Sequence, residues 1–162
     1  MRRSLKAMVF LLVMTFSAAA FAGGPELSSE MKAVKIVIDE KDHEITVPAD
    51  EVYPDDMLEY TLIYRNTGEV SASDVGFVGP VPSGTTYLDK TASDIEGLSP
   101  VFSIDGGKNY HQAPVTYEVI RKDGSSETKK ATPEMITHIK WILSKNFDVG
   151  EEATVSYRVQ VR

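Results

Sequence analysis

The sequence contains no cysteine. This absence excludes disulfide bonds, thiolate metal sites, cysteine nucleophiles and the acylated cysteine of a lipoprotein. Histidine occurs only at positions 43, 111 and 138, whereas histidine ligands of a metal site commonly lie two to five residues apart. The spacing therefore indicates no histidine-based metal centre, and the folded chain must depend on its hydrophobic core.

No apolar run is long enough to span a bilayer. Residues 7–16 form an apolar run of about ten residues, whereas a transmembrane helix needs roughly 20. Three basic residues precede this run, and a small-residue stretch ending in Ala20-Phe21-Ala22 follows it. These are the three parts of a secretory signal peptide. We predict that residues 1–22 are removed after Ala22 and that no stable membrane span remains, so we expect an exported protein, in a periplasm or outside the cell.

Basic residues are scarce relative to acidic ones, at 17 against 24. Loss of Arg2, Arg3 and Lys6 with the signal leaves 14 basic residues and a formal charge of −10. So acidic a surface repels phosphate groups, and we therefore expect no nucleic-acid partner and poor binding to anionic lipid.

The exported part of the chain has a short polar beginning and then one domain. Residues 23–30 (GGPELSSE) are small or polar and include a proline, which predicts a flexible leader. Residues 31–162 have the length of a single domain with its own core.

Apolar side chains recur at every second position through this domain. Residues 153–161 are the clearest case, because five apolar side chains alternate there with polar ones. A period of two is typical of a strand with one buried face. Similar runs cover residues 34–39, 45–47, 58–64, 75–81, 101–104, 115–120 and 135–143.

Turn signals rich in glycine, proline, asparagine and aspartate separate these runs, and no sustained helical period appears after the signal. The pattern predicts an all-β protein, an immunoglobulin-like antiparallel β-sandwich of about seven to nine strands. A closed barrel is the main structural alternative.

Four stretches, taken in order, resemble the motifs of one bacterial family. They are residues 54–68 (PDDMLEYTLIYRNTG), 72–87 (ASDVGFVGPVPSGTTY), 137–143 (THIKWIL) and 149–159 (VGEEATVSYRV). Together they are similar to the "domain of unknown function 11" family, a surface-repeat module for which the resemblance implies an immunoglobulin-like fold. The similarity extends over roughly residues 45–162.

The sequence departs from the family pattern at two places. Asp55 stands where the family usually has glycine, and Glu151 follows the late glycine without the usual preceding proline. Many relatives carry tandem copies on long surface proteins, whereas one copy occurs here. The resemblance therefore fits a small exported relative better than a stalk or spacer.

The residues that stand out within these motifs are predicted to be structural. Asn66 and Gly68 are expected to provide positive φ where the chain reverses. Trp141 is in phase with other apolar side chains of residues 135–143 and is expected to fill the centre of the core. Tyr60 and Gly150 belong to the strand and turn motifs of the family.

Residues 103–110 (SIDGGKNY) resemble the Asp-box hairpin found in sialidase propellers and other β proteins. We expect the Asp105 carboxylate to accept hydrogen bonds from the amides of its own turn, which includes Gly107, and Tyr110 to pack behind it. A sialidase would also need several such boxes and an arginine cluster, so the motif predicts a stabilised hairpin.

The acidic turns and the tyrosines allow two sharper hypotheses. Carboxylates at positions 39, 40, 42, 55 and 56 could gather and bind calcium, which takes six to eight oxygen ligands, but their spacing matches no defined calcium loop. Whether these turns bind calcium stays open. Tyr53, Tyr87 and Tyr110 lie near strand ends and could form a platform for a glycan, although such tyrosines are more often half-buried anchors.

No serine lies in a Gly-x-Ser-x-Gly turn, no phosphate-binding loop is present, and a small sandwich offers little room for a glycosidase cleft. We therefore predict no catalytic, metal-binding or cofactor-binding residues, no cofactor and no enzyme activity. The predicted function is a protein-interaction or structural role in the bacterial cell envelope, with another envelope or extracellular protein as partner. The alternative is a carbohydrate-binding module with a glycan as its ligand.

Overall fold

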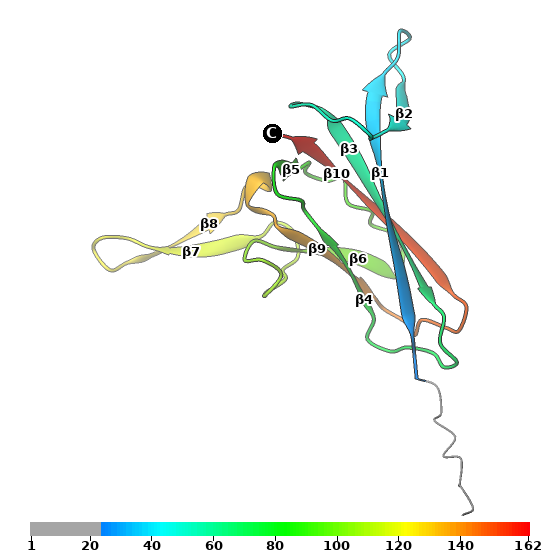
Figure 1. The fold of residues 1–162 in the computed structure, drawn as a ribbon. Helices are drawn as coiled ribbons and strands as arrows, with labels where there is room; N and C mark the ends of the chain where they lie inside the picture. The colour runs from blue at the N-terminus through cyan, green and yellow to red at the C-terminus, as the bar shows by residue number, and fades with distance from the viewer. Residues whose placement is uncertain (1–23) are drawn as a thin grey trace, which may run out of the picture.

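The computed structural model describes residues 24–162, which form an all-β protein (Figure 1). A single 3₁₀ turn, η1 (Pro133–Met135), interrupts the strands. The ten strands are β1 (Leu27–Ile38), β2 (Glu44–Pro48), β3 (Met57–Asn66), β4 (Gly76–Pro80), β5 (Thr85–Tyr87), β6 (Leu98–Ser103), β7 (Thr116–Ile120), β8 (Ser126–Lys130), β9 (His138–Leu143) and β10 (Glu152–Val161).

All strand pairs are antiparallel, and they form three sheets. The large sheet has the order β2-β1-β3-β10-β5, the small sheet the order β4-β9-β6, and β7 and β8 form a separate hairpin. The large and small sheets pack face to face (Figure 1). The predicted all-β sandwich is confirmed, and the sheets do not close into a barrel.

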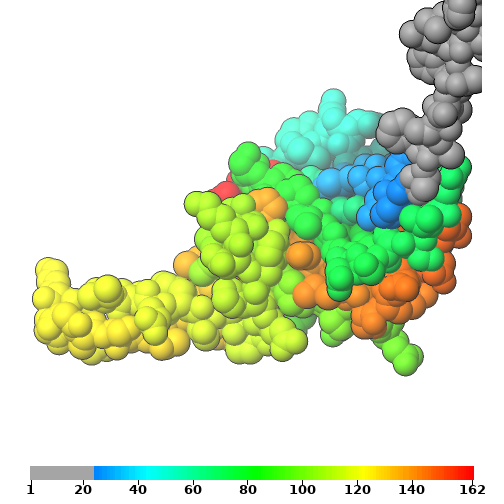
Figure 2. Space-filling view, turned by 90° about the horizontal axis from the view of Figure 1, so that it is seen from below, coloured from blue at the N-terminus to red at the C-terminus, as the bar shows by residue number. Residues whose placement is uncertain are grey.

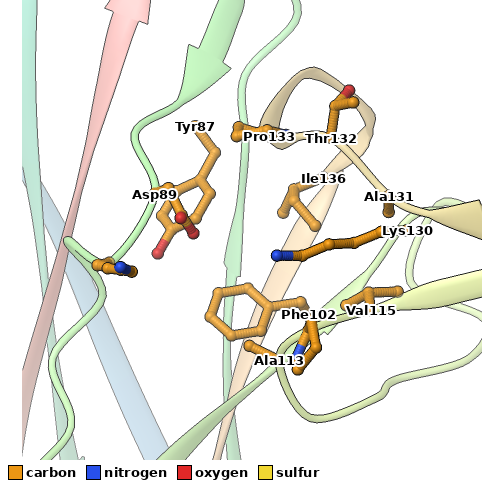
Figure 3. A pocket seen from close by; sticks show the side chains of 12 residues that line it. Tyr87, Asp89, Phe102, Ala113, Val115, Lys130, Ala131, Thr132, Pro133 and Ile136 are labelled. Carbon is orange, nitrogen blue, oxygen red and sulfur yellow. The ribbon is translucent and has the colours of Figure 1, made fainter.

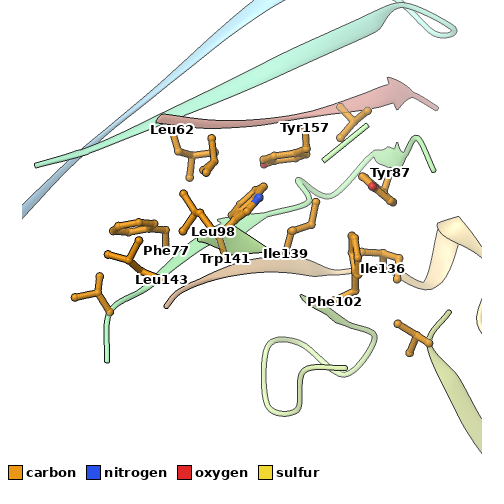
Figure 4. Close-up of a cluster of buried hydrophobic side chains, with 14 of the residues drawn as sticks. Leu62, Phe77, Tyr87, Leu98, Phe102, Ile136, Ile139, Trp141, Leu143 and Tyr157 are labelled. Carbon is orange, nitrogen blue, oxygen red and sulfur yellow. The ribbon is translucent and has the colours of Figure 1, made fainter. Parts of the chain in front are cut away.

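Alternation along the strands places the core between these two sheets. The buried side chains of the large sheet come from every second position of β3 and β10 and meet those of β4, β6 and β9 (Figure 4). The largest side chains that are fully buried are aromatic: Trp141, Tyr157, Phe77 and Phe147. Without disulfides, burial of this apolar surface is the main term that holds the two sheets together.

Trp141 lies at the centre of the core on β9. Its ring is fully buried, 6.1 Å from the Tyr157 ring between centroids, and its Nε1–H donates to the Ser93 carbonyl at 2.8 Å. Gly79 on the neighbouring β4 makes room for both rings, because a Cβ at that position would lie 2.9 Å from a Tyr157 carbon and 3.2 Å from a Trp141 carbon.

Three details of the strand prediction are wrong. The structure has ten strands, because the short β5 and the polar β8 carry no apolar alternation that a sequence pattern could detect. The predicted strand over residues 135–143 begins only at His138, since the chain from Pro133 first makes a 3₁₀ turn closed by the Ile136 N–H to the Pro133 carbonyl. The predicted flexible leader is a strand from Leu27 onward, which pairs with β3 through backbone groups while its side chains stay exposed.

The even-numbered apolar residues of β1 lie on the outer face of the large sheet and not on its core-facing side. Ala33 pairs with Tyr60, and Lys35 pairs with Leu58, so the odd-numbered residues of β1 share the core-facing side of the sheet. Ile36 is buried, but it lies on the outer face and outside the core cluster. Periodicity in the sequence shows that successive side chains lie on opposite faces of the sheet. It does not show which of the two faces packs against the other sheet.

We expect Trp141→Ala to lower the free energy of unfolding by about 3–5 kcal/mol, because it removes the largest core side chain and leaves a cavity. Ile142→Ala is the matched control, since Ile142 is the next residue of β9 and is half exposed on the outer face. Urea unfolding of both variants measures the difference. Equal stability of the two variants would contradict the central position of Trp141.

Candidate functional site

A cavity of about 600 Å³ lies where the sandwich meets the β7–β8 hairpin (Figure 3). Its floor is apolar and buried, formed by Tyr87, Phe102, Val115 and Ile136, each exposed by less than a tenth. A neighbouring hollow of about 440 Å³ shares Tyr87 and Phe102 with it. The two hollows share these side chains and are together called the groove.

Four separate segments position this floor. Tyr87 ends β5, and its ring lies 5.6 Å from that of Phe102 on β6. Ile136 follows the 3₁₀ turn, and Val115 stands just before β7, where its carbonyl accepts the Ala131 N–H at 2.8 Å and closes the base of the hairpin. Burial raises the pKa of Tyr87, so its hydroxyl stays neutral and accepts the Ala92 N–H at 3.2 Å.

Charged side chains line the rim of the cavity. Lys130 reaches across it, with its ammonium group between Phe102 and Ile136 (Figure 3). Asp89 stands on the opposite side (Figure 3). Lys90 also lines the cavity and has a left-handed backbone with φ of 63°. With two ammonium groups against one carboxylate, this lining is net positive over an apolar floor, which suits an apolar group that carries a negative charge.

The β7–β8 hairpin projects from the sandwich as an arm, defined here as residues 115–131 (Figures 1 and 2). Within residues 24–162, no third strand pairs with either of its edges. Asp123 stabilises the tip by accepting the Ser125 N–H at 2.9 Å, and Ile120 near the tip is 77% exposed. Unpaired strand edges with exposed side chains are able to pair with another chain.

The sequence did not identify this groove. Of the floor residues, the sequence singled out Tyr87 alone, as part of a glycan platform with Tyr53 and Tyr110 or, as is more common for such tyrosines, as a half-buried anchor. Tyr87 is 2% exposed, so it belongs to the core and to no exposed platform. The other two rings each have a lysine ammonium over one face, at 5.5 Å for Tyr53 and 5.6 Å for Tyr110.

Asn66 and Gly68 have a structural role that differs from the predicted one, since neither has positive φ. Asn66 is fully buried, where its Nδ2 donates to the carbonyls of Val70 and Phe147, each at 2.9 Å, and its Oδ1 accepts the Gly68 N–H at 3.1 Å. Gly68 is needed for close approach, because a Cβ there would lie 2.4 Å from the Glu26 backbone nitrogen.

Gly150 completes this turn from the other side. Its N–H donates to the Asn66 carbonyl at 2.9 Å, and its φ of 75° lies in the left-handed region that favours glycine. Tyr60, the other motif residue, stacks on Tyr157 with centroids 5.5 Å apart. Both residues therefore act within the scaffold.

Asp105 organises the loop between β6 and β7. Its Oδ1 accepts the N–H groups of Lys108 at 3.1 Å and Asn109 at 3.0 Å, and its Oδ2 accepts the Asn109 side-chain amide at 2.7 Å. The buried Ser103 hydroxyl donates to the same carboxylate at 2.7 Å and accepts the Gly107 N–H at 2.9 Å. These hydrogen bonds hold the pKa of Asp105 well below its usual range, and those from Asn109 have the largest effect.

Ser103 is a structural residue that the sequence reasoning missed, although it begins the quoted motif. Gly107 has φ of 83°, and a Cβ there would lie 3.0 Å from the Tyr110 hydroxyl oxygen. Tyr110 packs against the loop in this way and meets Lys140 of β9. These contacts hold the loop against the outer face of the small sheet.

The acidic turns bind their own backbone and neighbouring cations. Asp39 accepts the N–H groups of Lys41 and His43 at 2.7 and 2.9 Å. Asp56 accepts the Tyr53 N–H and pairs with Lys35 at 2.8 Å, and the hydrogen bond from Lys35 lowers the pKa of Asp56. Asp55 has φ of 72°, in the left-handed region. In the described part of the chain, no three histidine or acidic side chains are arranged to hold a metal ion.

No protein-family model, no curated protein and no solved structure matches this chain. Residues 24–162 contain no helix of the length and hydrophobicity that a membrane crossing requires.

We expect Asp105→Asn to lower the melting temperature at pH 7, because the loop amides lose a charged acceptor. A carboxylate with a depressed pKa in the folded state stabilises the protein above its unfolded pKa, near 3.8, and this stabilisation fades as pH falls through the folded value. The difference from wild type should therefore narrow below pH 4 in thermal melts. Asp50→Asn, at an exposed carboxylate, is the control, and an equal effect of both variants would contradict the assignment.

Asn66→Asp preserves the shape of the side chain and replaces its two donated hydrogen bonds with a carboxylate oxygen facing two carbonyl oxygens. We expect a loss of about 3 kcal/mol in the free energy of unfolding at pH 8. Burial raises the pKa of such a carboxyl, so the loss should be smaller at pH 4.5, where the acid regains its proton. Chemical denaturation at both pH values measures this, and a loss independent of pH would argue against a buried charge.

Proposed function

We propose that this protein is an exported, non-catalytic module of the bacterial cell envelope that binds another protein through its groove and arm. The basic, apolar and small-residue segments at the N-terminus support export. The resemblance of residues 54–68 and 149–159 to a bacterial surface module supports an envelope role. We propose a non-catalytic role because the sequence contains no enzyme motif.

The proposal rests on one observation, namely that a cavity lies beside an arm whose strand edges are unpaired among the residues that the structure describes. The cavity of about 600 Å³ is large enough for one or two apolar side chains and has a buried apolar floor. Beside it, the edges of β7 and β8 offer backbone groups along which a partner segment could add as a strand.

Charge gives the partner a chemical class. The exported chain has a formal charge of −10, yet the cavity lining carries two lysines, Lys90 and Lys130, and only one carboxylate, Asp89. A partner segment with an apolar side chain next to an acidic one would fill the floor and meet these ammonium groups. Strand addition would supply affinity through the backbone, and the cavity would supply selectivity.

Site-specific photo-crosslinking in intact cells tests the proposal. A photoreactive residue at Ile120 in the arm is expected to give a discrete adduct, whereas one at Glu40, in the distant β1–β2 turn, is not (Figure 1). Lys90→Glu with Lys130→Glu should reduce the Ile120 adduct without changing the melting temperature, since both lysines are exposed. No adduct at Ile120, or equal labelling at Glu40, would overturn the docking face.

A further inference from the structure

We propose that β1 is a self-association edge, at which residues 29–33 of two copies of the chain pair antiparallel about a two-fold axis centred on Met31. This interface would join two large sheets into one continuous sheet. It rests on the geometry and the charges of β1 and is independent of the docking face proposed above.

Half of β1 has no neighbour on its outer side. β2 pairs only with residues 34–38, and its last residue, Pro48, lies opposite Val34. Among residues 24–162, nothing pairs with the outer side of residues 27–33, although the same residues pair fully with β3 on the inner side (Figure 1). The large sheet therefore ends in an open, regular strand.

The backbone of this strand presents its hydrogen-bonding groups outward at odd-numbered positions. The Asp39 N–H donates to the His43 carbonyl, which shows that odd residues of β1 bond toward the β2 side. In an antiparallel ladder this direction alternates residue by residue. Ser29, Met31 and Ala33 therefore each direct an N–H and a C=O away from β3 into the open edge.

The side chains of the same segment have two distinct faces. Met31 and Leu27 lie on the face of Leu62 and Asn66, and they are 42% and 43% exposed because the small sheet does not extend over β1. Glu30 and Lys32 lie on the opposite face, where they pair with each other at 3.3 Å while both stay mostly exposed. Each copy thus offers an apolar residue flanked by opposite charges.

These charges favour the register about Met31 over the two registers centred one residue away. Centring the two-fold axis on Met31 places Met31 opposite its counterpart and sets Glu30 of each copy opposite Lys32 of the other. Centring it on residue 30 or 32 instead opposes two glutamates or two lysines, and like charges directly opposite on neighbouring strands are destabilising. The register about Met31 is also compatible with outward backbone groups, because it pairs odd residues with odd residues.

The edge of the small sheet differs from that of β1. The Tyr64 hydroxyl donates to the Val78 carbonyl at 2.9 Å and accepts the Val78 N–H at 3.1 Å, which occupies the backbone groups in the middle of β4. A side chain from the opposite sheet thus blocks strand addition at β4. No comparable contact covers Met31 within the described residues.

Charge reversal tests the register. Sedimentation velocity of the purified protein up to millimolar concentration is expected to show a monomer–dimer equilibrium, and Glu30→Lys or Lys32→Glu alone should weaken it about tenfold, because each creates two like-charge pairs. The double variant Glu30→Lys/Lys32→Glu should restore wild-type association. An equimolar mixture of the two single variants should also associate, since it re-forms both opposite-charge pairs. A wild-type protein that stays monomeric, or single variants that associate as well as wild type, would overturn the proposal.

Crosslinking tests the centre of the interface in a chain that has no cysteine of its own. Met31→Cys should form a disulfide-linked dimer under mild oxidation, because Cα atoms of a hydrogen-bonded antiparallel pair lie about 5.5 Å apart, within disulfide range. Ile120→Cys, at an exposed arm position, is the control for random collision. Equal dimer yields from both variants would argue against β1 pairing. They would not affect the proposed function, which is tested by the photo-crosslinking at Ile120.

Discussion

The fold depends on the packing of one aromatic layer between the two sheets. Trp141 and Phe77 from the small sheet meet Tyr157 from the large sheet, and all three are fully buried. The chain has no disulfide to restrict its unfolded state, so the apolar surface of this layer must offset the entropy lost on folding. The hydrogen bond from Trp141 to the Ser93 carbonyl fixes the ring in one orientation.

Polar residues at the ends of the strands then fix the connections. Asn66 joins the turn after β3 to the segment before β10 through buried hydrogen bonds to Val70 and Phe147. Asp105 fixes the loop after β6, because its carboxylate accepts hydrogen bonds from Lys108 and Asn109. These groups add specificity to the hydrophobic core, because a buried polar group is stable only in the arrangement that satisfies its hydrogen bonds.

The surfaces with functional potential lie where this packing stops. The groove forms because the arm leaves the sandwich beside Tyr87 and Phe102. The open half of β1 forms because β2 pairs only with residues 34–38, and Met31 is exposed there because the small sheet is narrower than the large one. One surface combines a cavity with cations, and the other combines a strand edge with self-complementary charges. Each would use backbone pairing to bind, and the side chains of each would select a different partner.

The sequence by itself determined the strand-rich character, the sandwich and the core position of Trp141, because alternation with period two and in-phase apolar residues are local properties of the chain. It predicted the self-capped loop at Asp105 for the same reason, since donor and acceptor there lie within four residues. It did not reveal that Leu27–Glu30 is a strand, that Ile36 faces outward or that Asn66 bonds across 81 residues to Phe147. Only the tertiary structure decided these, together with the groove and the open edge, because they depend on which distant strands pair and how far one sheet extends over the other.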